Sequence, residues 1–219
     1  MATRGLHRTS GPAHATRVRP ADVISFGMGE LLCFTPGTRL ATPRGTVAVE
    51  TLVRGDLVLT RDHGAQPIRW ISRTAVTSAE IAADPALAPV LIPRGSLAPN
   101  RPVRDMWVSP QHRMLVAGSK PALLFNCDEV LVPARALSNV RRTGTGTRYI
   151  GLLFDRHQIV FANGAQTESL HAGRLAKGRM SLSERAELFR LFPTLRTAPE
   201  DFGPPVRRAL GVGEGRLLA

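Results

Sequence analysis

Short apolar segments separated by turn residues recur along the middle of the chain. Between residues 31 and 170 they follow one another at intervals of roughly ten residues, which is the spacing typical of an all-β module. Residues 38–42 and 46–50, for example, lie on either side of Arg44-Gly45 and predict a hairpin. Because 20 glycines and 17 prolines supply turn residues throughout the chain, we expect a mainly β fold rather than a helix bundle.

Further strands are predicted from the same alternation of apolar segments and turns. They are residues 57–60, 67–73, 90–92, 106–108, 113–116 and 129–132, with 148–154 and 158–161 paired as the last hairpin. Residues 77–89 are polar, rich in alanine and broken by proline, and we interpret them as an inserted loop. A short helix begins near Ser181 or Ser183, where Glu184 fits a capping box, and ends at Pro193.

The chain of 219 residues is long enough for one well-buried core but not for a second full domain. We divide it into a flexible basic N-terminal arm (1–30), a compact β module (31–172), and a C-terminal helix with a loose tail (173–219). No apolar run approaches the ~20 residues of a membrane span, and the arm lacks the apolar centre of a cleavable signal. We therefore expect a cytoplasmic protein, or one exported without a cleavable signal peptide.

The formal net charge is +12, and almost all of the positive charge comes from arginine. A basic chain can bind nucleic acid through phosphate contacts, but these arginines are scattered, so we expect a basic surface and not a nucleic-acid site. Cys33 and Cys127 are the two cysteines, and no C-x-x-C pair predicts a zinc site. We expect no metal and no cofactor, and the sequence predicts no particular oligomeric state.

Three segments carry the residues on which a chemical function could depend. The first is Cys33-Phe-Thr-Pro-Gly-Thr38 with the downstream Gly55-Asp56, the second is Ser109-Pro-Gln-His112 between apolar strands, and the third begins at His157 and ends at Gly164. In this order they resemble the conserved blocks of Hint domains, the β-rich modules of inteins and Hedgehog C-terminal domains. The resemblance covers residues 31–170, and the opening C-F-T-P-G-T is similar to that of a bacterial Hint subfamily.

The resemblance implies a compact Hint-type β module that cuts itself between Leu32 and Cys33. The Cys33 sulfur would attack the Leu32 carbonyl in an N–S acyl shift, which replaces the peptide bond by a thioester. His112 would protonate the departing nitrogen, since an unperturbed imidazole titrates near neutral pH. Ser109 would steady the scissile amide or its oxyanion. His157 and Asp105 are the residues expected to assist.

The third segment departs from the intein pattern. Inteins end in His-Asn, whose asparagine cyclises and cuts the C-terminal junction, whereas Glu168-Ser169 stands in that place here and cannot form a succinimide. Gly151 falls near a position where many members of the family have Asp. We therefore expect no protein splicing. The thioester would instead pass to a small nucleophile, which is water, a thiol, an amine or an alcohol.

Other functions stay open at this point. A non-catalytic Hint-fold module, acting in structure or interaction, would form no thioester. A basic nucleic-acid-binding protein, the less favoured alternative, would bind in a salt-dependent way that does not require Cys33. In the self-processing interpretation the chain acts on itself and does not turn over an external substrate. A Cys33–His112 protease would act on other chains, but the sequence gives no signal for a substrate groove.

Overall fold

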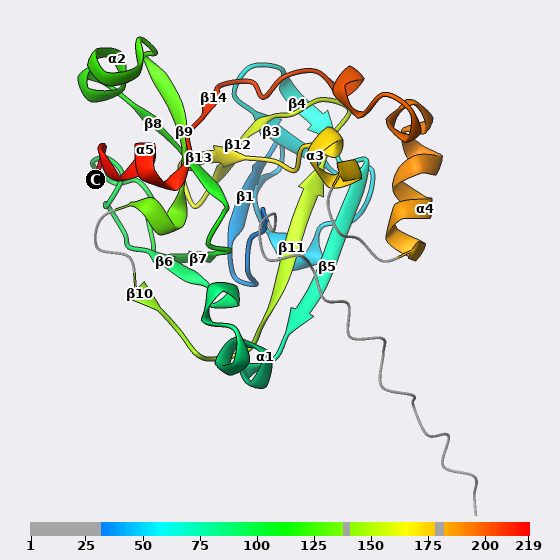
Figure 1. The fold of residues 1–219 in the computed structure, drawn as a ribbon, viewed down its shortest axis with the longest axis horizontal. Coiled ribbons are helices and arrows are strands. Elements are labelled where there is room, and N and C mark those ends of the chain that lie inside the picture. The colour runs from blue at the N-terminus through cyan, green and yellow to red at the C-terminus, as the bar shows by residue number, and fades with distance from the viewer. Residues whose placement is uncertain (1–31, 138–140, 178–181) are drawn as a thin grey trace, which may run out of the picture.

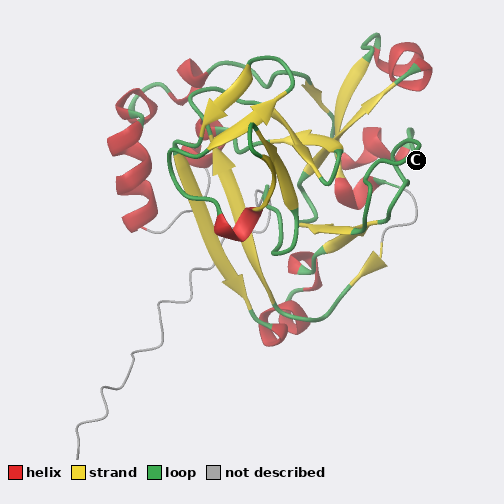
Figure 2. Cartoon of the chain, turned by 180° about the vertical axis from the view of Figure 1, so that it is seen from behind, coloured by secondary structure: helices red, strands yellow, loops and turns green. Residues whose placement is uncertain are grey.

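The computed structural model describes residues 32–137, 141–177 and 182–219. The predicted N-terminal arm therefore lies outside the described residues. In the described part the fold is mainly β, as the sequence predicts, and short helices lie around the outside of the strands (Figure 1, Figure 2).

The largest sheet has the N-terminal hairpin at one end of its strand order and a C-terminal strand at the other. Its strands are β1 (Arg39–Thr42), β2 (Gly45–Ala48), β3 (Leu57–Thr60), β4 (Gly64–Pro67), β8 (Arg113–Ala117), β9 (Glu129–Pro133), β12 (Ile159–Ala162), β13 (Ala165–Glu168) and β14 (Arg208–Ala209). They follow the order β14-β9-β8-β13-β12-β1-β2, and β3 pairs with both β12 and β4. The pairing of β1 with β2 confirms the predicted hairpin.

Two smaller sheets complete the β structure and position the N-terminal end of the described chain. One is formed by β6 (Val90–Ile92), β7 (Met106–Val108) and β10 (Arg141–Arg142), and the other by β5 (Trp70–Val76) and β11 (Thr147–Leu153). Figure 1 shows β5 and β11 as a long antiparallel pair. Phe34 forms antiparallel bridges with Val108 of β7 and Ile150 of β11. The chain around Cys33 is therefore held between two sheets.

The predicted pairing of residues 148–154 with 158–161 is wrong. β11 pairs with β5 along its whole length, and β12 forms its hairpin with β13. The turn between β12 and β13 is Asn163-Gly164, and both residues have positive φ angles, of 47° and 78°. Asn-Gly favours a two-residue hairpin turn of this kind because both residues tolerate left-handed backbone. The local turn chemistry thus determines the partner of β12.

Residues 77–89, predicted as a loop, form helix α1 (Ser78–Ala83) and a 3-10 turn, η2 (Pro85–Leu87). Thr77 and Glu80 form a capping box: the Thr77 hydroxyl accepts from the Glu80 amide, and the Glu80 carboxylate accepts from the Thr77 amide. Ile81 of α1 and Ala88 are buried beside Cys33. The insertion therefore covers the region of Cys33 instead of extending into solvent.

The C-terminal region packs against the β strands. The predicted helix is α4 (Leu182–Leu191), and its predicted cap Ser181 lies outside the described residues. The sequence predicts a loose tail over the last residues, but β14 pairs in parallel with β9, and Leu210 is fully buried beside that strand. Burial of such apolar side chains fixes the segment in place. The other elements of this region are α3 (Ala172–Lys177), η4 (Pro193–Arg196), η5 (Pro199–Phe202) and α5 (Val212–Arg216).

The main core lies between the sheets and is formed by apolar side chains from both halves of the chain, among them Phe34, Leu40, Met114, Ile150 and Val160. Three short elements connect the strands around it: η1 (Val49–Thr51), α2 (Ser119–Phe125) and η3 (Ala134–Ala136). None of the helices in the described ranges is both long and apolar enough to cross a membrane.

Candidate functional site

Cys33 and Ser109, which are 76 positions apart in the sequence, are joined by two hydrogen bonds, one of which involves the Ser109 side chain. The Cys33 amide N–H donates to Ser109 Oγ at 2.9 Å, and the Ser109 amide N–H donates to the Cys33 carbonyl, also at 2.9 Å. The bridge between Phe34 and Val108 brings the two segments together. The structure thus joins the first two sequence segments at the nitrogen atom of the predicted scissile bond.

The Cys33 thiol is enclosed. Only 2% of the residue is exposed, and it packs in one cluster with Val76, Ile81, Ala88 and Tyr149. Burial raises the pKa of Cys33 to about 12; a hydrogen bond with Ser72 opposes this shift, and the charge of Glu184 adds to it. The thiol is therefore protonated at neutral pH.

His112 is fully buried, and its hydrogen bonds define its tautomer. The Thr167 hydroxyl donates to the Arg113 carbonyl at 2.7 Å and lies 2.5 Å from His112 Nε2. The single hydroxyl proton of Thr167 is used in the bond to the Arg113 carbonyl. Toward His112, Thr167 can therefore only accept, so Nε2 carries the imidazole proton. Nδ1 is then the basic nitrogen, and it has no well-aligned hydrogen-bond partner in the described part of the chain. The His112 and Phe34 rings pack in an edge-to-face arrangement, with their centroids 4.5 Å apart.

Burial lowers the pKa of His112 to about 4, while the charge of Glu168 and a contact with the backbone of Leu32 act in the opposite direction. His112 is neutral at pH 7 as a result. The three residues predicted to be catalytic, Cys33, Ser109 and His112, therefore surround one peptide bond, between Leu32 and Cys33.

His157 lies in a neighbouring buried cluster and not against Cys33. Its Nδ1 accepts from the Val206 amide at 3.2 Å, and its Nε2 lies 3.4 Å from Glu168 Oε2. Glu168 Oε1 also accepts from the amide and guanidinium of Arg113, both at 3.1 Å. Burial acts to raise the pKa of Glu168, but His157 and Arg113 together bring it below its ordinary value. Glu168 therefore forms a buried ionic group one residue after Thr167.

Asp105 does not join this site. The residue is exposed, and its carboxylate accepts from the Arg94 amide at 2.7 Å. Ser169, which the resemblance puts in the place of the intein asparagine, is buried. Its hydroxyl accepts from the Gln158 amide at 3.0 Å and donates to the Leu170 carbonyl at 3.2 Å. Both side chains are thus used in local structure.

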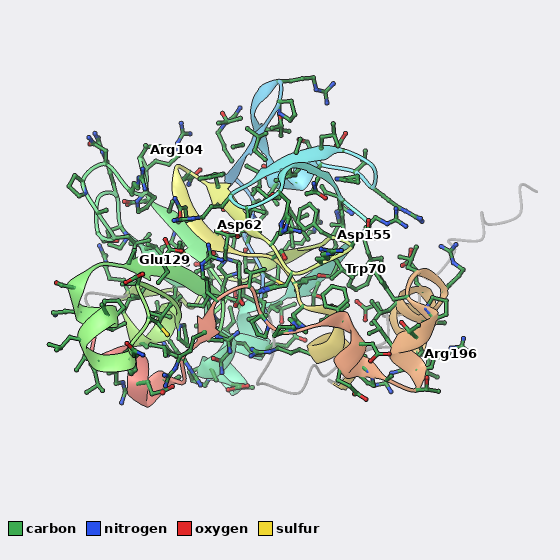
Figure 3. All side chains as sticks on the ribbon, turned by 90° about the horizontal axis from the view of Figure 1, so that it is seen from above. Asp62, Trp70, Arg104, Glu129, Asp155 and Arg196 are labelled. Carbon is green, nitrogen blue, oxygen red and sulfur yellow. The ribbon has the colours of Figure 1, made fainter. Side chains whose placement is uncertain are left out.

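Leu32 is buried by the C-terminal region. Its cluster contains Trp70, Leu188 of α4 and Leu195 of η4. Trp70 lies on the side of the β strands that faces α4 (Figure 3), and its indole N–H donates to Glu187 of that helix at 2.7 Å. The residue before Cys33 is therefore held by elements that follow the third sequence segment.

Sequence reasoning missed two hydroxyl residues of the site, Thr167 and Ser72. Thr167 directly precedes the Glu168-Ser169 pair that follows the third segment, and this position was the available signal. Ser72 follows the apolar Trp70-Ile71 pair, and only strand register brings it near Cys33. No group of three or more His, Cys, Asp or Glu side chains that could hold a metal ion is found within residues 32–137, 141–177 and 182–219.

The sequence matches a known domain family. Residues 32–174 match the family model described as Hint domain. Similar solved structures are the AceL NrdHF class 3 split intein, in a splice-inactive variant (14% identity, covering 63% of this chain and 97% of that chain, TM-score 0.40); the bacterial intein-like domain from Clostridium thermocellum (12%, 63% and 98%, 0.39); and a DnaB intein from Synechocystis sp. PCC 6803 (10%, 63% and 98%, 0.40). No curated protein matches the sequence. Because the family model spans more than half of the chain, the chain belongs to the Hint domain family.

Proposed function

We propose that this chain is a self-processing Hint domain of the C-F-T-P-G-T subfamily, which forms a thioester at Cys33 and is then cleaved there without splicing. One observation carries the proposal: the two sides of a single peptide bond are engaged by the expected groups. His112 lies beside the backbone of Leu32, and the Cys33 amide donates to Ser109 Oγ at 2.9 Å.

The proposed step is an isomerisation. Cys33 Sγ attacks the carbonyl carbon of Leu32, the new C–S bond forms, and the C–N bond breaks. The thiol proton ends on the nitrogen of Cys33, which becomes a free amine, so no external oxidant or co-reactant is required. An amide is more stable than a thioester, and the reaction needs a following nucleophile to draw it forward.

His112 acts first as a base in this proposal, because a group with a pKa near 4 holds no proton at neutral pH. Its free Nδ1 takes the thiol proton as negative charge grows on the Leu32 oxygen, since that charge stabilises the imidazolium. The Nδ1–H then donates to the oxyanion and finally passes the proton to the nitrogen. General acid–base catalysis of this kind contributes about 10²–10⁴ in rate. Ser109 holds the nitrogen in place throughout.

The nucleophile that receives the acyl group is a small molecule: water, a thiol, an amine or an alcohol. Glu168 and Ser169 lack the side-chain amide that a C-terminal cleavage needs, and both are committed to buried hydrogen bonds. The reaction is therefore restricted to the N-terminal junction. His157 acts in this scheme as a positioning residue, because it contacts Glu168 and not the scissile bond.

One observation favours the second candidate, a non-catalytic Hint module. The Cys33 thiol is closed off from solvent, and its pKa of about 12 makes the thiolate scarce. A buried cysteine of this kind also serves simply as a small apolar side chain. The two candidates differ in whether a thioester forms at all.

Intact mass of the purified full chain, with and without dithiothreitol or hydroxylamine, separates them. We expect loss of residues 1–32 that depends on the added nucleophile, that Cys33→Ala abolishes, and that Cys127→Ala leaves unchanged. Cys127 is the matched control because it is the other free cysteine and is half-buried. An unchanged mass under all conditions would refute self-processing and favour the non-catalytic module.

A further inference from the structure

Strand register puts Cys33, Gly151 and Ser72 in one row. The Phe34 amide donates to the Ile150 carbonyl at 2.8 Å, and the Ile150 amide donates to the Phe34 carbonyl at 2.9 Å, so the preceding residue, Cys33, lies opposite Gly151. On the other side of β11, Gly151 pairs with Ser72 of β5. Residues directly opposite each other in antiparallel strands project to the same face. Cys33 and Ser72 therefore lie on one face, on either side of a glycine.

The absence of a side chain at Gly151 makes room for the Ser72 hydroxyl. A Cβ atom at Gly151 would lie 2.6 Å from Ser72 Oγ and 2.7 Å from Leu170 Cδ1, which is closer than such atoms can approach. Neighbouring strands are ~4.8 Å apart, so side chains on the two outer strands of a row meet only where the middle residue carries none. The hydroxyl thus lies over Gly151, in the space that separates it from Cys33.

The surroundings of the thiol make this hydroxyl chemically distinctive. Val76, Ile81 and Ala88 in the same cluster are apolar, and the Tyr149 hydroxyl donates to the Leu87 carbonyl at 2.7 Å. A thiol that is almost completely enclosed is oriented by the acceptor that it meets, and the Ser72 hydroxyl is such an acceptor.

We propose that Ser72 is a further catalytic residue of this chain, whose hydroxyl accepts a hydrogen bond from the Cys33 thiol over Gly151 and directs the sulfur toward the Leu32 carbonyl. The inference rests on the proposed self-processing function and deepens it. The contact also opposes the effect of burial on the acidity of Cys33. Ser72 neither gains nor loses a proton. As the sulfur attacks, the S–H bond turns from Ser72 to His112 Nδ1, which takes the proton and passes it to the Cys33 nitrogen when the C–S bond forms and the C–N bond breaks.

The contact can be tested separately from the reaction by the S–H stretching band in the Raman spectrum. In a Cys127→Ser background, Cys33 carries the one remaining thiol. We expect Ser72→Ala to move the band to higher wavenumber, because the S–H bond loses its acceptor. Thr74→Val is the matched control: it removes a hydroxyl from the same strand and the same face, two residues away, and should leave the band in place.

The rate is measured on the same variants as hydroxylamine-dependent cleavage of the full chain. We expect Ser72→Ala to cleave about tenfold more slowly, which corresponds to the loss of one net hydrogen bond, and Thr74→Val to cleave like the parent. Gly151→Ala, which displaces the hydroxyl, should change the band and the rate in the same directions. An unmoved band in Ser72→Ala, or a moved band with an unchanged rate, overturns the role of Ser72. A parent chain that never cleaves instead overturns the proposed function, and the band still decides whether the contact exists.

Discussion

The amide N–H of Cys33 donates to the hydroxyl of Ser109, and the amide N–H of Ser109 donates to the carbonyl of Cys33, both at 2.9 Å. This reciprocal pair fixes the nitrogen of the Leu32–Cys33 bond while leaving the carbonyl carbon on the other side to the thiol. The Ser109 hydroxyl accepts one of these two hydrogen bonds, and the effect of removing it can be tested.

Ser109→Ala should slow hydroxylamine-dependent cleavage by about tenfold or more and destabilise the fold by about 1–3 kcal/mol, because a buried N–H loses its acceptor. Ser109→Thr keeps the oxygen and should retain most of the activity. Ser119→Ala, at an exposed serine, is the control. Intact mass reports the rate of cleavage, and urea unfolding reports the stability. Equal cleavage by the Ala and Thr variants would exclude a role for the hydroxyl.

The lowered pKa of His112 makes the stability of the fold depend on pH. His112 takes up a proton near pH 6.5 in the unfolded chain but only near pH 4 in the folded chain. Its contribution to the free energy of unfolding is therefore fully present above about pH 6.5 and is lost as the pH falls toward 4. Between about pH 7.5 and about pH 5 the loss from this group is about 2 kcal/mol. Urea unfolding at the two pH values should show a smaller loss in His112→Gln than in the parent. His63→Gln, at an exposed histidine, should behave like the parent; a parent-like loss in His112→Gln would contradict the assignment.

The sequence predicts the strands better than their partners. Alternation of apolar and polar residues identifies the faces of residues 148–154 but says nothing of which strand lies beside them, and β5 is more than 70 positions away. Asn163-Gly164 is a strong local hairpin signal, and it predicts that β12 pairs with the strand that directly follows it. β14 has only two residues, too few to show any period.

The same limit applies to the site. Cys33, Ser109 and His112 lie in segments that resemble conserved Hint blocks, and that resemblance implies that they meet. Asp105 lies close to the second segment in the sequence, directly before β7. Its exposed carboxylate accepts from the Arg94 amide and takes no part in the site. Ser72 has no pattern of its own and reaches Cys33 only through the register of β5 with β11.

Glu168→Gln should destabilise the fold by about 3–5 kcal/mol at neutral pH, because it leaves the nearly buried Arg113 guanidinium without its anion. The pKa of Glu168 is lowered in the fold, so its contribution is present above the ordinary carboxyl value near 4.5 and is lost as the pH falls below it. The difference between parent and variant should therefore shrink in acid. Urea unfolding of Glu200→Gln, at an exposed carboxylate, gives the reference; similar small losses in both variants would show that the buried ion pair contributes little.

Leu188→Ala tests whether α4 belongs to the same folding unit as the junction. Leu188 is fully buried with Leu32 and Trp70, so truncation should cost about 2–5 kcal/mol. Leu182 of the same helix is 88% exposed, and Leu182→Ala should change stability by no more than about 0.5 kcal/mol. Leu188→Ala also removes apolar contact from the cluster that holds Leu32, so this variant should slow cleavage at the Leu32–Cys33 bond. Leu182→Ala should not. Tryptophan fluorescence during urea unfolding reports the loss of stability, and intact mass reports the rate of cleavage. A stable, fully active Leu188→Ala chain would mean that α4 is dispensable for holding the junction.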